Sequence, residues 1–64
     1  MMRWRSTPEA HELRRIVTGR LVAKVTPMVG MYRTHLWDRS GYSTTTCYTF
    51  EDAKTWCEIE SAKP

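Results

Sequence analysis

The sequence predicts a small α+β domain with a short N-terminal helix, a three-stranded antiparallel meander and a C-terminal helix packed on one sheet face. Three observations predict it. A Thr-rich extended stretch runs straight into a helix-start signal at residues 44–57, and residues 20–48 alternate apolar and polar side chains between turn signals. A length of 64 residues allows one domain at most.

The first seven residues are expected to form a flexible basic arm, ahead of a single domain of residues 8–64. The arm carries Trp4 between Arg3 and Arg5. Trp and Arg are frequent at binding hot spots, so the arm is a candidate contact for a base or a protein pocket. An unstructured tail is the alternative interpretation.

A short helix is expected to follow the arm. Ser6 is a suitable N-cap, with Glu9 three residues later and Pro8 in the first turn. Gly19 is a suitable helix stop. One face of this helix would be apolar, formed by Ala10, Leu13 and Val17.

Three strands are expected next. The first covers residues 21–26, and Pro27 ends it because proline cannot donate a ladder hydrogen bond. The second covers residues 31–37, and alternation does not say which of its faces is buried. The Asp-Arg-Ser-Gly segment at residues 38–41 suits a hairpin connection into the third strand, residues 42–48.

The C-terminal helix has the most specific start signal in the chain. Thr49 can accept a hydrogen bond from a first-turn amide, and Asp52 three residues later completes a shortened capping box, so the helix begins at Phe50. Its apolar stripe is expected to cover one sheet face, with Cys47 pointing toward it. The stripe consists of Phe50, Ala53, Trp56, Cys57 and Ile59.

Charge is unevenly distributed along the chain, whose net charge is +3. Six Lys and Arg face two Glu in the first 24 residues, whereas four acidic residues outnumber two Lys in the last 15. A basic half favours approach to phosphate or to an acidic protein surface, although ordinary solubility explains the same charge equally well. The candidate phosphate-facing stripe is Arg14, Arg15 and Arg20.

No apolar run approaches the roughly 20 residues that cross a bilayer, and the Arg-bearing start is not followed by an apolar signal core. A cytoplasmic protein with no membrane contact is therefore expected. In a reducing compartment its two cysteines are expected to be thiols rather than a Cys47–Cys57 disulfide.

Catalytic and metal chemistry are not expected. Cys47, Cys57, His11 and His35 are possible zinc ligands, but none forms a closely spaced pair, so core thiols and ordinary imidazoles are favoured. A Cys57–His35 nucleophile pair is not favoured, because a catalytic thiol needs a positive environment and Cys57 has acidic neighbours. The sequence thus predicts a non-enzyme without metal or cofactor.

Residues 21–25, 41–42 and 49–56 give the order strand, strand, strand, Thr-capped helix. This order resembles the small domain shared by phage-integrase arm-binding regions and AP2-type DNA-binding domains, and small proteins of phages and mobile elements more generally. The resemblance implies that the uncovered sheet face lies in the DNA major groove, which a β-ribbon can enter. The positions that it implies for sheet-face contact are Lys24, Arg33, His35, Tyr42, Thr44 and Thr46.

Two functions follow from these expectations. The first is a nucleic-acid-binding module whose basic arm and first helix contact phosphates while the open sheet face approaches DNA. The second is a protein-binding inhibitor or adaptor that acts on a host protein, or a homodimer formed through an uncovered sheet face or edge strand. Its aromatic anchors would be Trp4, Trp37, Tyr42 and Tyr48.

Overall fold

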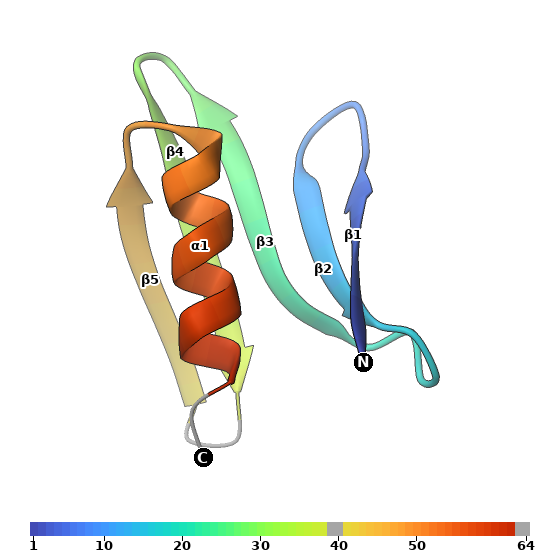
Figure 1. Ribbon diagram of the computed structural model, residues 1–64. Coiled ribbons are helices and arrows are strands. Elements are labelled where there is room, and N and C mark those ends of the chain that lie inside the picture. Colours follow the sequence, from blue (N-terminus) through green and yellow to red (C-terminus); the bar gives the residue numbers. More distant parts are fainter. Residues whose placement is uncertain (39–40, 63–64) are drawn as a thin grey trace.

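The computed structural model describes residues 1–38 and 41–62. In this part of the chain a five-stranded antiparallel sheet, with strand order β1-β2-β3-β4-β5, carries one C-terminal helix (Figure 1). The elements are β1 (Met2–Ser6), β2 (His11–Arg15), β3 (Leu21–Met28), β4 (Met31–Asp38), β5 (Gly41–Cys47) and α1 (Phe50–Ser61).

The predicted N-terminal helix and three-stranded meander are wrong, because β1 and β2 occupy the N-terminal segment and extend the sheet to five strands. The expected helix-start residues form the tight turn between these strands. Thr7 donates its amide to the carbonyl of Ala10 (2.8 Å), and its hydroxyl oxygen accepts from the Ala10 amide (3.0 Å). Ser and Thr side chains hydrogen-bond backbone amides in tight turns as readily as at helix N-termini, so this motif alone could not distinguish a turn from a helix start.

The predicted helix stop at Gly19 also lies in a turn, here between β2 and β3. The amide of Gly19 donates to the carbonyl of Arg15 (2.9 Å), and Gly19 has a φ of 71°, which glycine adopts at little cost. Val17, expected on the buried helix face, is 93% exposed. The residues expected to form a basic arm, 1–7, contain strand β1 instead.

The three predicted strands are present as β3, β4 and β5. Strand β3 runs past Pro27 to Met28, two residues longer than expected. On its β2 side the pairing stops at Val25, so no ladder bond on that side needs an amide from Pro27. The predicted hairpin joins β4 to β5 through the pair Asp38 and Gly41, and its residues Arg39 and Ser40 lie outside the described residues.

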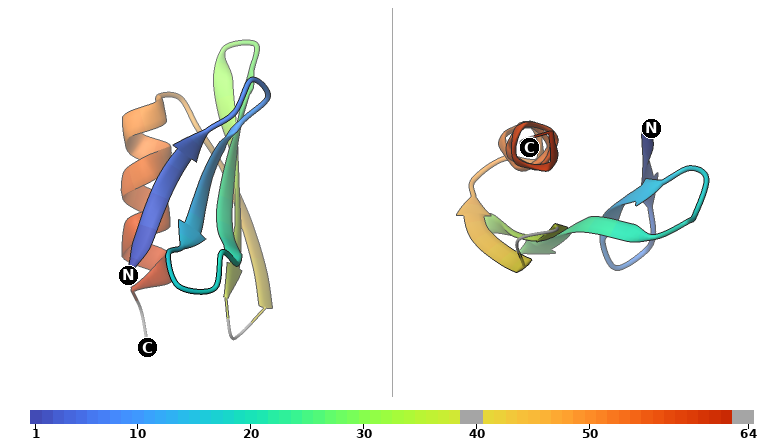
Figure 2. Two further views of the ribbon diagram at one scale, coloured as in Figure 1. Left: turned by 90° about the vertical axis from the view of Figure 1, so that its right-hand side faces the viewer. Right: turned by 90° about the horizontal axis from the view of Figure 1, so that it is seen from below.

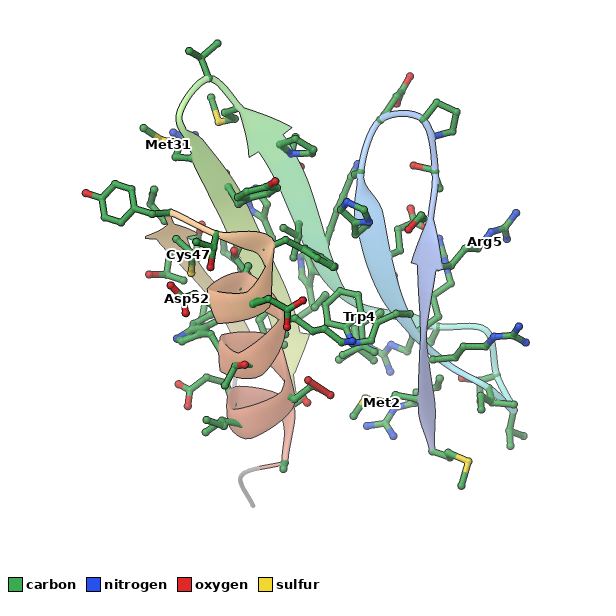
Figure 3. The ribbon with its side chains drawn as sticks, turned by 45° about the horizontal axis from the view of Figure 1, so that its top comes forward. Met2, Trp4, Arg5, Met31, Cys47 and Asp52 are labelled. Carbon is green, nitrogen blue, oxygen red and sulfur yellow. The ribbon has the colours of Figure 1, made fainter. Side chains whose placement is uncertain are left out.

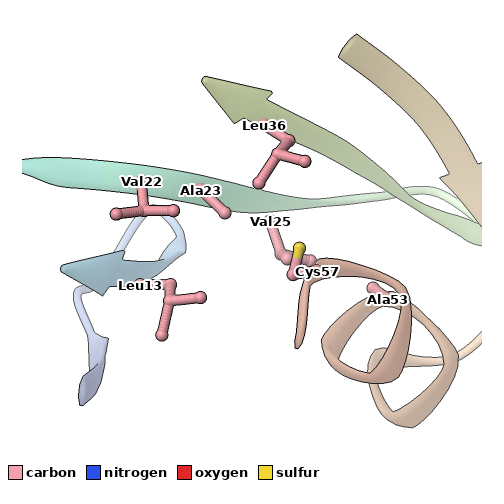
Figure 4. Packing of buried hydrophobic residues seen from close by; sticks show 7 residues of the cluster. All are labelled: Leu13, Val22, Ala23, Val25, Leu36, Ala53 and Cys57. Carbon is pink, nitrogen blue, oxygen red and sulfur yellow. The ribbon is translucent and has the colours of Figure 1, made fainter. Parts of the chain in front are cut away.

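Helix α1 begins at Phe50 as predicted, and the Thr49 hydroxyl oxygen accepts a hydrogen bond from the Asp52 amide (3.1 Å). The helix covers β3, β4 and β5 on one face of the sheet (Figure 1). The core lies between these layers and extends to β2 (Figure 4). It consists of Leu13, Val22, Ala23, Val25, Leu36, Ala53 and Cys57.

An aromatic group closes the core on the side of β1 and β2. Phe50 at the start of α1 lies edge-on to Trp4 (ring centroids 5.9 Å apart) and close to His11 (4.2 Å). The indole N–H of Trp4 is buried and has no hydrogen-bond partner in the described part of the chain, so packing alone holds the ring. Trp4 is therefore a structural residue of the covered face.

Candidate functional site

The face of the sheet opposite α1 is uncovered, and we call it the open face. Successive side chains of a strand point to opposite faces, so residues that alternate with buried ones lie on the open face. Lys24 lies between buried Ala23 and Val25, and His35 lies between buried Thr34 and Leu36. The strand register extends this row across the whole sheet as Arg5, Glu12, Lys24, His35 and Thr44.

The open face is strongly basic. Its only carboxylate among the described side chains is Glu12, whose Oε1 accepts from Arg14 Nε at 3.0 Å in an ion pair. The other described acidic side chains lie in the turn at Glu9 and on α1. Five cationic side chains share the open face: Arg3, Arg5, Arg14, Lys24 and Arg33.

Four arginines line one pocket of about 570 Å³ at the β1–β2 end of the sheet, three of them from the open face, while Arg15 and Trp4 line it from the covered face. Figure 3 shows Arg5 and Trp4 pointing to opposite sides of β1, as strand alternation requires. Arg15 and the turn residue Gly19 complete the pocket. Its lining residues are Arg3, Trp4, Arg5, Arg14, Arg15, Ile16 and Gly19.

One guanidinium of this pocket is held in place. Arg14 donates from Nε to Glu12 and from Nη1 to the carbonyl of Gly19 (2.8 Å). Arg3 lies directly opposite Arg14 across the β1–β2 ladder, an arrangement that destabilises a sheet when no anion is present. The pocket is therefore suited to bind an anion, and guanidinium groups bind phosphate oxygens with well-defined geometry.

An aromatic cluster lies at the opposite end of the open face, where β4 and β5 pair. His35 stacks on Trp37 (centroids 6.0 Å apart, planes at 21°) and on Tyr42 (5.8 Å, 24°). His35 Nδ1 also hydrogen-bonds the Tyr42 hydroxyl group. Trp37 is 40% exposed and Tyr42 53% exposed, so the cluster presents ring surface to solvent.

The structure brings most of the predicted site residues together. Nine lie on the open face by register: Arg3, Arg5, Arg14, Lys24, Arg33, His35, Tyr42, Thr44 and Thr46. Arg15 lines the arginine pocket, and Arg20 is exposed at the end of the turn that precedes β3. Trp4 packs on Phe50 on the covered face, and it also lines the arginine pocket.

Trp37 joins the site, although from the sequence it is expected only as a protein-binding anchor. Alternation along residues 31–37 already places it on the same face as Arg33 and His35. This alternation was sufficient to assign Arg33, His35 and Trp37 to one face from the sequence. The contribution of Arg3, Arg5 and Arg14 to the same face could not be found without knowledge of β1 and β2.

Both thiols pack in or against the hydrophobic core. Cys47 and Cys57 are free, and burial, with smaller contributions from Cys47 and Glu58, raises the pKa of Cys57 to about 12. The residues described contain no group of three or more His, Cys, Asp or Glu placed to hold a metal ion. A buried thiol with a raised pKa is a poor nucleophile.

No family model, curated protein or solved structure matches the chain. Within residues 1–38 and 41–62, no helix is long and apolar enough to span a membrane.

Proposed function

We propose that this chain is a small, non-enzymatic nucleic-acid-binding protein, of the type that phages and mobile elements encode, and that its open face contacts the ligand. The observation that carries the proposal is the excess of cations on that face. Arg3, Arg5, Lys24 and Arg33 have no ion-pair partner in the described residues, and the single carboxylate is engaged by Arg14. Two free thiols fit the cytoplasmic location that we propose for it.

Phosphate groups would supply the missing negative charge. The arginine pocket offers several guanidinium groups for one or two phosphates, Lys24 continues the basic surface toward His35, and Arg33 adds a cation beyond His35 on β4. Contacts of this kind provide affinity without sequence information. Thr44 and Thr46 on the same face add hydroxyl groups that can bind phosphate or sugar oxygens.

Salt dependence tests the proposal directly. Fluorescence anisotropy with random-sequence oligonucleotides, single-stranded and duplex, should show binding that weakens between about 50 and about 200 mM salt. Four neutralised phosphates predict a loss of roughly 50- to 150-fold, because each contact releases condensed counterions. Absence of binding to any oligonucleotide at low salt, with folded protein in large excess, would contradict the proposed function.

A protein partner is the second candidate, and a specific observation favours it. Strand β5 pairs only with β4, which leaves its other edge free to accept a strand from a partner or from a second copy of the chain. Trp37, Tyr42 and Tyr48 remain available as exposed anchors, whereas Trp4 does not. Affinity capture from nuclease-treated lysate tests this candidate, and a stoichiometric protein that survives the nuclease would support it.

A further inference from the structure

We infer that the open face binds single-stranded nucleic acid in preference to duplex, with an unpaired base stacked on the cluster of His35, Trp37 and Tyr42. This inference rests on the proposed function and names its ligand class. It follows from the exposure of the aromatic cluster, from the shape of the sheet and from the position of Lys24 between the cluster and the arginine pocket.

The aromatic cluster exposes ring surface on which an unpaired base can stack. Trp37 and Tyr42 expose about half of their surface on a face that is otherwise cationic and threonine-rich. Every base has a π-face that can stack on such rings, but in a duplex these faces are already stacked on neighbouring base pairs. A duplex would therefore leave the cluster without a partner, whereas a flexible single strand would cover it.

The width of the sheet also opposes a duplex. Five strands at a spacing of about 4.8 Å separate the outer strands by roughly 19 Å, whereas the major groove of B-DNA is only about 12 Å wide. The basic residues extend from β1 to β4 and the cluster joins β4 to β5, so the face cannot enter a groove as a unit. Major-groove insertion, which the family resemblance implies, would leave much of this surface unused.

The curvature of the sheet also favours a single strand over a duplex. Strands β1 and β2 are twisted out of the plane of β3, β4 and β5, so that the start of β1 lies on the side of the sheet that holds α1 and the β1–β2 turn lies on the other side (Figure 2). The arginine pocket and the aromatic cluster therefore lie on differently oriented parts of one bent surface. A duplex is stiff, with a persistence length of about 50 nm, and does not follow such a bend, whereas a single strand does.

The charge pattern supplies a path between the two ends of the site. Lys24 lies on β3, with His35 of the cluster on one side and Glu12, the ion-pair partner of Arg14, on the other; Arg33 lies two residues from His35 on β4, on the side away from Trp37. A strand whose base stacks on Trp37 can place a following phosphate at Lys24 and end at the arginines of the pocket. Base contact at one end and phosphate contact along the rest is the arrangement that sequence-tolerant single-strand binding requires.

A competition between strand states tests the inference. Fluorescein-labelled oligo(dT) and oligo(U) dodecamers and a duplex of the same length would be titrated with the protein at one moderate salt concentration. Tighter binding of either single strand than of the duplex, by tenfold or more, is the expected result. Equal or tighter binding of the duplex would overturn the inference and leave the proposed function intact, whereas failure to bind all three ligands would remove both.

Matched tyrosine variants test the stacking contact itself. Tyr42→Leu should weaken single-strand binding roughly 5- to 150-fold, the range that loss of one base–aromatic stack produces, while Tyr42→Phe keeps the ring and should stay close to the parent protein. Tyr48→Leu is the control, because Tyr48 is 80% exposed and has no ring partner in the described residues. Circular dichroism and thermal melting would establish that each variant is folded.

Equal effects of Tyr42→Leu and Tyr48→Leu in folded proteins would overturn the stacking contact. Unchanged binding by Tyr42→Leu would overturn it as well. Quenching of Trp37 fluorescence by oligo(dT) provides an independent readout, and Trp37→Phe should remove most of the quenched signal, because Trp56 packs against the core and Trp4, which lines the arginine pocket, is partly buried there.

Discussion

Cys57 illustrates how one buried side chain is tuned by its surroundings. It is fully buried in α1 within the core cluster that includes Val25 and Leu36, and this loss of water is the main cause that raises its pKa to about 12 from 9.0. Cys47 and Glu58 add smaller electrostatic contributions in the same direction. Removing the proton would place a thiolate in an apolar core, which is costly.

This raised pKa predicts a loss of stability at alkaline pH. The folded protein retains the Cys57 proton above pH 9.0, where the unfolded chain releases it, so the stabilisation is complete below pH 9.0 and lost as the pH rises toward about 12. Between neutral pH and about pH 10.5 the free energy of unfolding should fall by about 2 kcal/mol from this group alone. Urea denaturation at the two pH values measures the loss.

Cys57→Ala is the control for the alkaline experiment. Tyr and Lys side chains also titrate near this pH, and subtracting the pH dependence of Cys57→Ala removes their contribution. The variant should be less stable at neutral pH, because its core contains a small cavity, but should lose less stability on going to high pH. Identical pH dependence in both proteins would contradict the assignment.

The elements that depend on local signals were predictable, and α1 is the clearest case. Thr49 and Asp52 form the cap that their spacing predicts, and the helix begins at Phe50. The hairpin from β4 to β5 and the turn before Met31 also follow from residues close in sequence. In these segments the local preference and the final fold agree.

The N-terminal half was not predictable from local signals. The segment at residues 10–17 fits a helical apolar stripe, yet residues 11–15 form a strand in which Leu13 is the one large apolar side chain, and so short a segment fits either period. Pairing with other strands determines that this segment is a strand, because Leu13 lies opposite Trp4 of β1 on one side and Ala23 of β3 on the other. An isolated helix of this length would also be only marginally stable.

The N-cap of α1 is open to a direct test. Thr49→Ala removes the hydroxyl oxygen that accepts from the Asp52 amide, and the free energy of unfolding should fall by about 1 kcal/mol. Thr55→Ala is a matched control, since Thr55 is exposed in the middle of the same helix and alanine is the better helix former. Chemical denaturation of the two variants should therefore give changes of opposite sign or clearly unequal size.

At the scale of the whole molecule, charge is separated between two layers. The open face carries the cations, and α1 on the other side carries the exposed carboxylates Glu51, Asp52 and Glu58. From the sequence only the uneven distribution along the chain was evident. The three-dimensional separation depends on β1 and β2, which bring Arg3, Arg5 and Arg14 beside Lys24, and no local pattern predicts that pairing.

Two lysine variants distinguish a local contact from net charge. Lys24→Gln and Lys54→Gln remove the same charge, one from the open face and one from α1. Lys24→Gln should weaken oligonucleotide binding and reduce the slope of affinity against salt by about 0.7 to 0.9, the contribution of one phosphate contact. Lys54→Gln should leave both nearly unchanged. Equal weakening by the two variants would indicate long-range attraction without contact at Lys24.

The order of the strands in the sheet has a consequence for synthesis of the chain. Each strand pairs only with its neighbours in sequence, so every hairpin can close as soon as its second strand leaves the ribosome. Helix α1 is made after all five strands, however, and it covers one side of the sheet. A nascent sheet therefore exposes Val25 and Leu36 until residues 50–61 arrive, and during that interval the growing chain is prone to aggregate.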